Sequence, residues 1–388
     1  MGRVILGWIN RGDQMTDPAA KDSKTAPTAA SNAAAGTAGQ APKKAASGLL
    51  DRGLERTRLK VDFDPADFGM APLSLEILVA GEPSPADLYM PLYNREKRAV
   101  EMNPACAMGD EFKASWRDRL LDAEQTKVYV PLAQAPMLNS YFSTFANAIM
   151  SDTRAGTRKK TMVLQELADL NMRSLFGSEL TPKAVEGAVG QAQEAVTRMS
   201  RDTQILSSLG TILKTDYNVY AHSVNVCMLS MAFGRYLRFS ESAVSAMGVG
   251  GMLHDVGYSK LPKDLLTKEE PLTSAEQEQA RNHTRLGYQT LMPIPSVPYD
   301  ALMIVMHHHE NADGSGYPHG LKAEKTPLPA RLARLVDAFD AMTSARPHQD
   351  ARTAYQAAAT MMQERDNIFG ADLVPTFVRF LASPFITS

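Results

Sequence analysis

Three consecutive histidines, His307, His308 and His309, lead directly into a polar loop that holds two glycines, a tyrosine and a proline. All eight histidines of the chain lie after residue 221. Adjacent imidazoles followed by a tight glycine-containing loop are typical of a metal centre beside an anionic substrate. The sequence therefore predicts that the chemistry lies in the C-terminal half of the chain.

Composition narrows the classes of partner. A net charge of -2 gives no reason to expect a long nucleic acid or a membrane surface as the main partner, whereas a small anionic ligand fits a local site. No run approaches the ~20 apolar residues of a spanning helix. The two cysteines, Cys106 and Cys227, lie far apart in sequence, which favours a reducing compartment over a disulfide framework. We expect a cytoplasmic protein.

The composition and the predicted secondary structure of the chain change along its length. Residues 1–57 are expected to be a disordered tail, because the segment 18–48 contains no leucine, isoleucine, valine or aromatic residue. Residues 58–150 predict a small α+β domain, and because it has no histidine we expect it to be regulatory. Helical patterns then fill a linker, 151–204, and a domain, 205–388. The fold class expected is an all-α helical bundle preceded by a small α+β domain, with strands at 75–79, 88–93 and 127–132 and a helix at 110–121.

The linker contains one clear amphipathic helix. Thr181 and Pro182 form a typical helix start, with a hydroxyl cap before proline. The apolar positions that follow alternate in steps of four and three, which predicts either the buried stripe of a single helix or a seam that pairs two subunits of a homodimer. They are Val185, Val189, Ala192, Val196 and Met199.

Imidazoles and carboxylates are spread over successive predicted helices, as a site inside a helical bundle requires. This donor set suits iron, manganese, zinc or nickel, and no thiolate is available for a softer site. Seven donors exceed the four of a tetrahedral site, whereas two divalent ions that share a bridging carboxylate would use them all. The seven are His222, His254, Asp255, His283, His308, His309 and Asp337.

From about residue 205 to 385 the chain resembles the HD-GYP domain, the cyclic di-GMP phosphodiesterase branch of the HD phosphohydrolases. The resemblance rests on His-Ser-Val-Asn-Val from 222, His-Asp-Val-Gly from 254, His283, His-His-Glu-Asn-Ala-Asp-Gly-Ser-Gly-Tyr-Pro from 308 and Asp-Ala-Phe-Asp-Ala-Met-Thr-Ser from 337. It implies two divalent transition metal ions, with iron or manganese expected before zinc or nickel. One ion would be held by His222, His254, Asp255 and Asp337, and the other by Asp255, His283, His308 and His309.

The same resemblance assigns roles to further residues. It implies hydrolysis of cyclic di-GMP to pGpG, to GMP or to both, through a hydroxide that two metals activate. Asp340 would orient a ligand, and His307 would not be one. The resemblance places Asp255, Tyr258 and Lys260 in catalysis, and in substrate binding Gly316, Tyr317, Pro318, Lys322, Arg331 and Arg346.

The chain departs from the family pattern at three positions. Tyr258 stands where the family usually has lysine, Asn218 replaces a glutamate that could hold a third metal, and Gln349 replaces a basic residue. We therefore expect two metals rather than three, and one basic residue fewer for binding the substrate. An alternative to the enzyme is a receptor that binds cyclic di-GMP with little turnover and signals to a protein partner through the N-terminal domain or the Gly-Tyr-Pro loop. A third interpretation keeps hydrolysis but changes the phosphoester.

Overall fold

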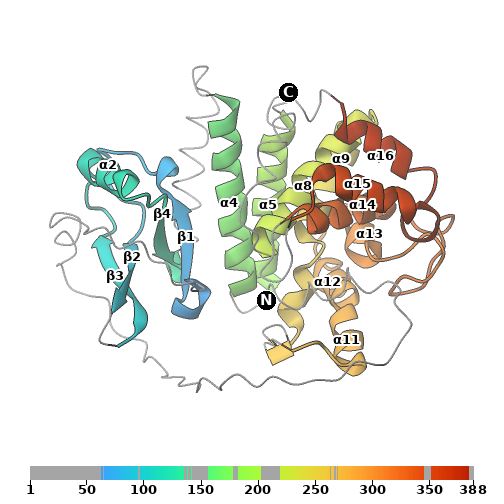
Figure 1. Cartoon of the computed structure of the whole chain (residues 1–388), viewed down its shortest axis with the longest axis horizontal. Helices are drawn as coiled ribbons and strands as arrows, with labels where there is room; N and C mark the ends of the chain where they lie inside the picture. The colour runs from blue at the N-terminus through green and yellow to red at the C-terminus, as the bar shows by residue number, and fades with distance from the viewer. Residues whose placement is uncertain are drawn as a thin grey trace, which may run out of the picture.

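The computed structural model describes residues 63, 65–94, 97–134, 138, 141, 156–177, 182–201, 219–262, 264, 265, 268, 270–344 and 351–383. The expected tail, residues 1–57, lies outside the described residues, and so do Asn218, Arg346 and Gln349. A small sheet region lies at one end of the molecule and a helical bundle at the other (Figure 1). The predicted fold class, a helical bundle preceded by a small α+β domain, is confirmed.

The N-terminal sheet is fully antiparallel, with strand order β1-β4-β2-β3. Burial alternates along β1 and β4, so one face of the sheet carries the apolar residues, among them Leu73, Val128 and Val130. Helix α2 adds Trp116 and Leu120 to the same core. The elements are β1 (Met70–Ser74), β2 (Leu88–Asn94), β3 (Ala99–Cys106), α2 (Ala114–Asp122) and β4 (Lys127–Pro131).

The expected strands at 88–93 and 127–132 are confirmed as β2 and β4, and the expected helix at 110–121 is α2, which begins later. The strand expected at 75–79 is wrong. Residues Leu75–Ile77 form a 3-10 turn, because the Ser74 hydroxyl accepts a hydrogen bond from the Glu76 amide and caps it. Strand β3 was not predicted, since Glu101, Asn103 and Pro104 break its apolar pattern.

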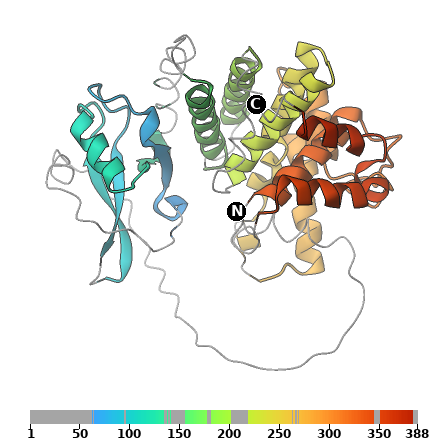
Figure 2. The ribbon, with the colours of Figure 1, turned by 45° about the horizontal axis from the view of Figure 1, so that its top comes forward.

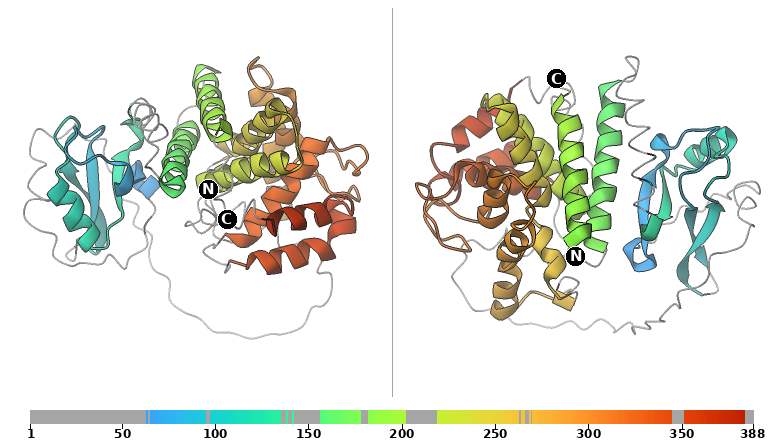
Figure 3. Two further views of the ribbon diagram at one scale, coloured as in Figure 1. Left: turned by 90° about the horizontal axis from the view of Figure 1, so that it is seen from above. Right: turned by 180° about the vertical axis from the view of Figure 1, so that it is seen from behind.

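Two long helices, α4 (Thr157–Gly177) and α5 (Pro182–Arg201), lie between the sheet and the bundle, as the views from above and behind show (Figure 3). Val163 of α4 joins the apolar core of the sheet, whereas Leu164 and Ala168 join the core of the bundle. Helix α4 therefore packs on both regions. The predicted stripe of α5 is buried within the chain at Val185, Val189, Ala192 and Val196, which accounts for its periodicity without a second subunit.

Helix α9 packs against α8, α13 and α5 within the helical bundle. Figure 2 shows the bundle from a second direction. Every residue from 246 to 253 in α9 is buried, because neighbouring helices cover it on several sides. None of the described helices is long and apolar enough to cross a membrane. The bundle comprises α8 (Val219–Tyr236), α9 (Glu241–Leu253), α11 (Ser274–Arg281), α12 (His283–Leu291), α13 (Tyr299–His307), α14 (Leu328–Thr343), α15 (Ala354–Gln363) and α16 (Val374–Leu381).

Candidate metal centre

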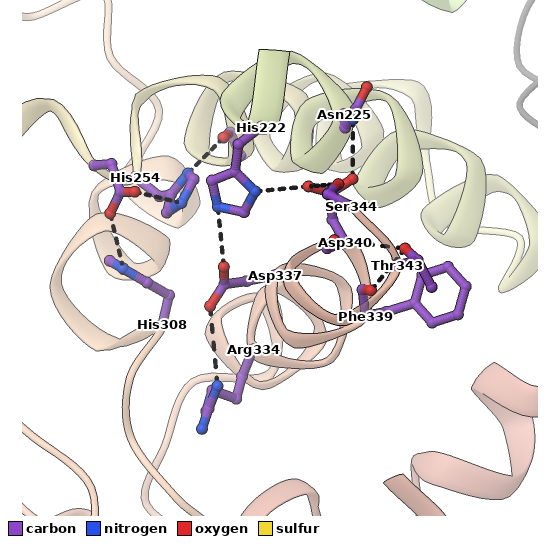
Figure 4. A network of polar contacts seen from close by, with 12 residues as sticks. His222, Asn225, His254, His308, Arg334, Asp337, Phe339, Asp340, Thr343 and Ser344 are labelled. Carbon is purple, nitrogen blue, oxygen red and sulfur yellow. Dashed lines mark hydrogen bonds and ion pairs between the residues drawn. The ribbon is translucent and has the colours of Figure 1, made fainter. Parts of the chain in front are cut away.

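Five helices bring the seven expected ligands together inside the bundle. The donors form two overlapping groups, each with ligand atoms within 4.8 Å of one another. One group is His222, His254 and Asp255, and the other is Asp255, His283, His308 and His309. The seventh donor, Asp337 on α14, places Oδ1 3.2 Å from Nε2 of His222 (Figure 4). Residues up to 115 positions apart in the chain thus share one buried site, as the sequence predicted for these donors.

Hydrogen bonds fix the orientation of four of the imidazoles. In each ring Nδ1 has an acceptor, so Nδ1 carries the hydrogen and Nε2 presents its lone pair to the centre of the site. For three of the rings the acceptors are backbone carbonyls near helix ends. The contacts are His254 to Gly251 O at 2.8 Å, His283 to Ala280 O at 2.8 Å, His308 to Ile304 O and Val305 O at 3.1 Å each, and His222 to Asp340 Oδ2 at 2.7 Å.

Asp255 is the residue that the two groups share. Its Oδ2 lies 3.2 Å from Nε2 of His254, on the side of the first group. Its Oδ1 lies 3.4 Å from Nε2 of His283 and 3.6 Å from Nε2 of His308, on the side of the second. One carboxylate oxygen therefore faces each group, which is the arrangement that a bridging ligand between two cations requires.

The donor set fits divalent cations, because two of its buried donor atoms have no hydrogen-bond partner among the described residues. Nε2 of His254 and Oδ2 of Asp337 are buried without a hydrogen bond in the described part of the chain. Nε2 of His283 and Nε2 of His308 lie 3.3 Å apart, and both rings already use Nδ1 as the donor. Two facing lone pairs at this distance are stabilised only by a proton or a cation between them. The site can therefore hold metal.

The charges of the site suit metal binding. Burial alone would raise the pKa of Asp255, but the neighbouring His254, His308 and His283 outweigh it and hold that pKa well below its usual range. Burial likewise opposes ionisation of Asp337, yet His222 lowers its pKa overall. Burial lowers the pKa of His283 to about 4, which keeps this imidazole neutral at neutral pH and leaves its lone pair available.

Tyr258 and Lys260, expected to act in catalysis, lie in different surroundings. The Tyr258 ring is 4% exposed and stacks on the His283 ring at 4.1 Å between centroids. The neighbouring Gly257 permits this contact, since a Cβ there would lie 1.8 Å from the His283 carbonyl oxygen. Lys260 is exposed and lines a cavity of about 650 Å³ beside α5 and α12, which none of the seven donors lines.

The Gly-Tyr-Pro loop folds back over His309. A Cβ on Gly316 would lie 2.2 Å from the Asn311 amide nitrogen and 2.4 Å from the His309 carbonyl oxygen, so only glycine fits. The Tyr317 amide donates to that same carbonyl at 3.1 Å, and its ring stacks on the His309 imidazole at 4.7 Å. The carbonyl of Pro318 accepts from Arg285 at 3.1 Å. Gly316, Tyr317 and Pro318 therefore border the metal centre.

The basic residues expected to bind substrate do not gather there as a set. Lys322 is exposed on the same loop. Arg331 forms an ion pair with Asp372 at 2.5 Å, and Arg346 lies outside the described residues. Their roles in substrate binding stay predictions.

Two other arginines, which the sequence analysis missed, lie closer. The guanidinium of Arg334 lies 3.9 Å from Oδ2 of Asp337, and that of Arg281 lies 5.3 Å from the Tyr317 ring centroid. Arg334 stands one helical turn before Asp337, and this i, i+3 spacing on a predicted helix was the available signal.

Comparison with protein families matches residues 194–373 to the family described as "HD domain". This span contains all seven donors. A cyclic di-GMP phosphodiesterase of Pseudomonas aeruginosa is 34% identical over 194 residues, 49% of this chain and 46% of that protein. A cyclic di-GMP phosphodiesterase response regulator of Xanthomonas campestris is 37% identical over 145 residues, 37% of this chain and 38% of that one. The chain thus spans less than half the length of either relative.

Among solved structures, an HDG"Y"P protein from Bdellovibrio bacteriovorus superposes with a TM-score of 0.59 at 18% identity. The superposition covers 81% of this chain and 100% of that chain, so the likeness in fold extends beyond residues 194–373. At this identity the likeness concerns the fold.

Proposed function

We propose, because residues 194–373 match the HD-domain family, that the protein is a metal-dependent phosphodiesterase that opens cyclic di-GMP to pGpG, to GMP or to both. The observation that carries the proposal is the position of Asp255, whose two oxygens face separate groups of imidazoles. The names of the two curated relatives support the choice of substrate.

We assign two divalent ions to the site, with iron or manganese preferred by its mixed imidazole and carboxylate donors. Bound there, the ions would lower the pKa of a water molecule and neutralise charge on the phosphate oxygens. The first ion would be held by His222, His254, Asp255 and Asp337, and the second by Asp255, His283, His308 and His309.

The remaining residues of the site hold the ligands and the substrate. Asp340 holds His222 through Nδ1 and so keeps Nε2 directed at the first ion. The guanidinium of Arg334, beside Asp337, is the cation that we assign to a phosphate oxygen beyond the reach of the metals. Arg281, over the Tyr317 ring, is available for the second phosphate of a cyclic dinucleotide.

A receptor for cyclic di-GMP is the second candidate, and the surroundings of Tyr258 favour it. The ring that replaces the family's lysine lies flat on His283 and brings no positive charge to the leaving group. Lys260, the nearest ammonium in sequence, lines a different cavity. A protein with this site would bind the nucleotide and turn it over slowly.

Incubation of the metal-loaded full-length chain with cyclic di-GMP separates these candidates. Appearance of pGpG or GMP, lost in Asp255→Asn and retained in the surface control Glu278→Gln, supports the enzyme. Tight retention of intact cyclic di-GMP supports the receptor. If neither a product nor retained cyclic di-GMP is found, both candidates are contradicted, and another phosphoester becomes the substrate to test.

A further inference from the structure

His307 belongs to a second cluster of metal-ligating side chains. This cluster is separate from the site of the seven donors described above, which we call the HD centre. It is the last residue of α13, and its ligand atom lies within 4.8 Å of ligand atoms from Glu310 and His319. None of these three residues is among the seven donors described above. The cluster joins the end of α13 to the loop that carries Tyr317, because His319 lies two residues after that tyrosine.

The His307 imidazole is buried without a full partner. The residue is 8% exposed, and its Nδ1 has no hydrogen bond within the described part of the chain. The closest acceptor, Oε1 of Glu310, lies 3.7 Å away, beyond hydrogen-bond distance. The His307 and His319 ring centroids are 5.3 Å apart, at an interplanar angle of 48°. A buried, unpaired nitrogen thus faces a carboxylate and a second imidazole.

Glu310 is held in a fixed orientation by the loop. Its Oε1 accepts a hydrogen bond from the His319 amide at 2.8 Å, and its Oε2 accepts one from the Leu321 amide at 2.9 Å. Each carboxylate oxygen has a further lone pair beyond the one that the amide uses. Oε1 can therefore bind a cation while the loop hydrogen bonds remain.

From this geometry we propose that His307, Glu310 and His319 form an independent mononuclear site for a zinc-like divalent cation. Two imidazoles and one carboxylate are a common donor set for zinc, and the exposed side of His319 leaves a fourth position for water. The bond lengths of zinc, about 2.0 to 2.2 Å, require the three ligand atoms to draw closer together. The ion would tie the loop that holds Tyr317 to the end of α13.

Zinc binding by the full-length chain tests this site directly. Equilibrium dialysis against zinc with elemental analysis compares wild type, His319→Ala and His307→Gln. Each variant is expected to bind about one equivalent less than wild type, because each removes one of three protein ligands. Glu278→Gln, which changes an exposed residue of α11 that is not one of the three ligands, is the control and is expected to bind as wild type does. An unchanged zinc content in both cluster variants overturns the proposal.

A second readout separates this site from the HD centre. Zinc is expected to slow amide hydrogen exchange in residues 310–321 of wild type and of His283→Ala, which removes an HD-centre donor, and to have no such effect in His319→Ala. Because His319 is exposed, that variant should melt as wild type does in the presence of a chelator. Zinc-dependent protection that disappears in His283→Ala and persists in His319→Ala assigns the effect to the HD centre and contradicts the proposal.

Discussion

Nδ1 of His222 lies 2.7 Å from Oδ2 of Asp340, and this contact fixes which nitrogen of the imidazole faces the metal centre (Figure 4). Asp340 is itself fully buried and held by further donors, Asn225 at 2.9 Å and Ser344 at 3.4 Å. A carboxylate behind a ligating histidine orients the ring and raises its basicity. Asp340 is therefore a positioning residue.

The first prediction concerns this contact. In Asp340→Asn the ring loses an anionic acceptor, so affinity for the first ion should fall on the order of 10- to 100-fold. Metal titration followed by calorimetry measures the loss, and the KM for cyclic di-GMP should change far less than kcat. Glu278→Gln, which replaces a surface carboxylate by an amide, is the control. Metal affinity equal to that of wild type contradicts this role for Asp340.

Metal removal should destabilise the protein. Two buried donor atoms, Nε2 of His254 and Oδ2 of Asp337, have no hydrogen bond in the described part of the chain and would lose a ligand contact when the ions are withdrawn. An ion at 100 times its Kd adds about 2.7 kcal/mol to the free energy of unfolding, so a chelator should lower the thermal midpoint by several degrees. Asp337→Asn should show a smaller chelator effect. A midpoint that does not respond to chelator argues against resident ions.

A lysine at position 258 tests whether the missing positive charge would limit the proposed turnover of cyclic di-GMP. In Tyr258→Lys, kcat for cyclic di-GMP should rise, while loss of the stack on His283 should cost about 1 kcal/mol of stability. Tyr258→Phe is the control, because it keeps the stacked ring and adds no charge. If kcat rises equally in both variants, or in neither, the missing cation does not limit turnover.

The contact between α4 and the sheet should depend on pH through Glu166. Burial and the neighbouring Asp169 raise the pKa of Glu166 from 4.5 to about 7. Between these values the native state binds more protons than the unfolded state, so the free energy of unfolding falls as pH rises from 4.5 to 7. Urea titrations of wild type and Glu166→Gln measure this slope. The variant should be more stable than wild type at pH 8 and equal to it near pH 4.5, whereas parallel pH profiles contradict the assignment.

The sequence could propose the seven donors of the HD centre because the chain has only eight histidines. The family resemblance then singled out the carboxylates that accompany them. The sequence could not orient these side chains. The contact of Asp340 with His222 depends on how α8 and α14 pack, which brings together residues 118 positions apart in the chain. Short apolar runs are ambiguous because a 3-10 turn can bury their side chains as well as a strand can. Residues 75–77 do so, and their apolar side chains lie in the core of the sheet region.

The histidine triplet shows a further limit of sequence. Three adjacent imidazoles look equivalent along the chain, but successive residues at a helix end point in different directions. His308 and His309 therefore reach the group around Asp255, whereas His307 lies with Glu310 and His319. The family resemblance set His307 apart from the other two, but only the coordinates place it beside Glu310 and His319.

The shared carboxylate is tested most directly by metal content. Protein prepared anaerobically in a His319→Ala background, which removes the second cluster from the count, is compared with and without Asp255→Asn by elemental analysis. If Asp255 bridges two ions as we propose, the variant should lose about two equivalents of transition metal together. Loss of a single equivalent, or none, would contradict a bridging role for Asp255.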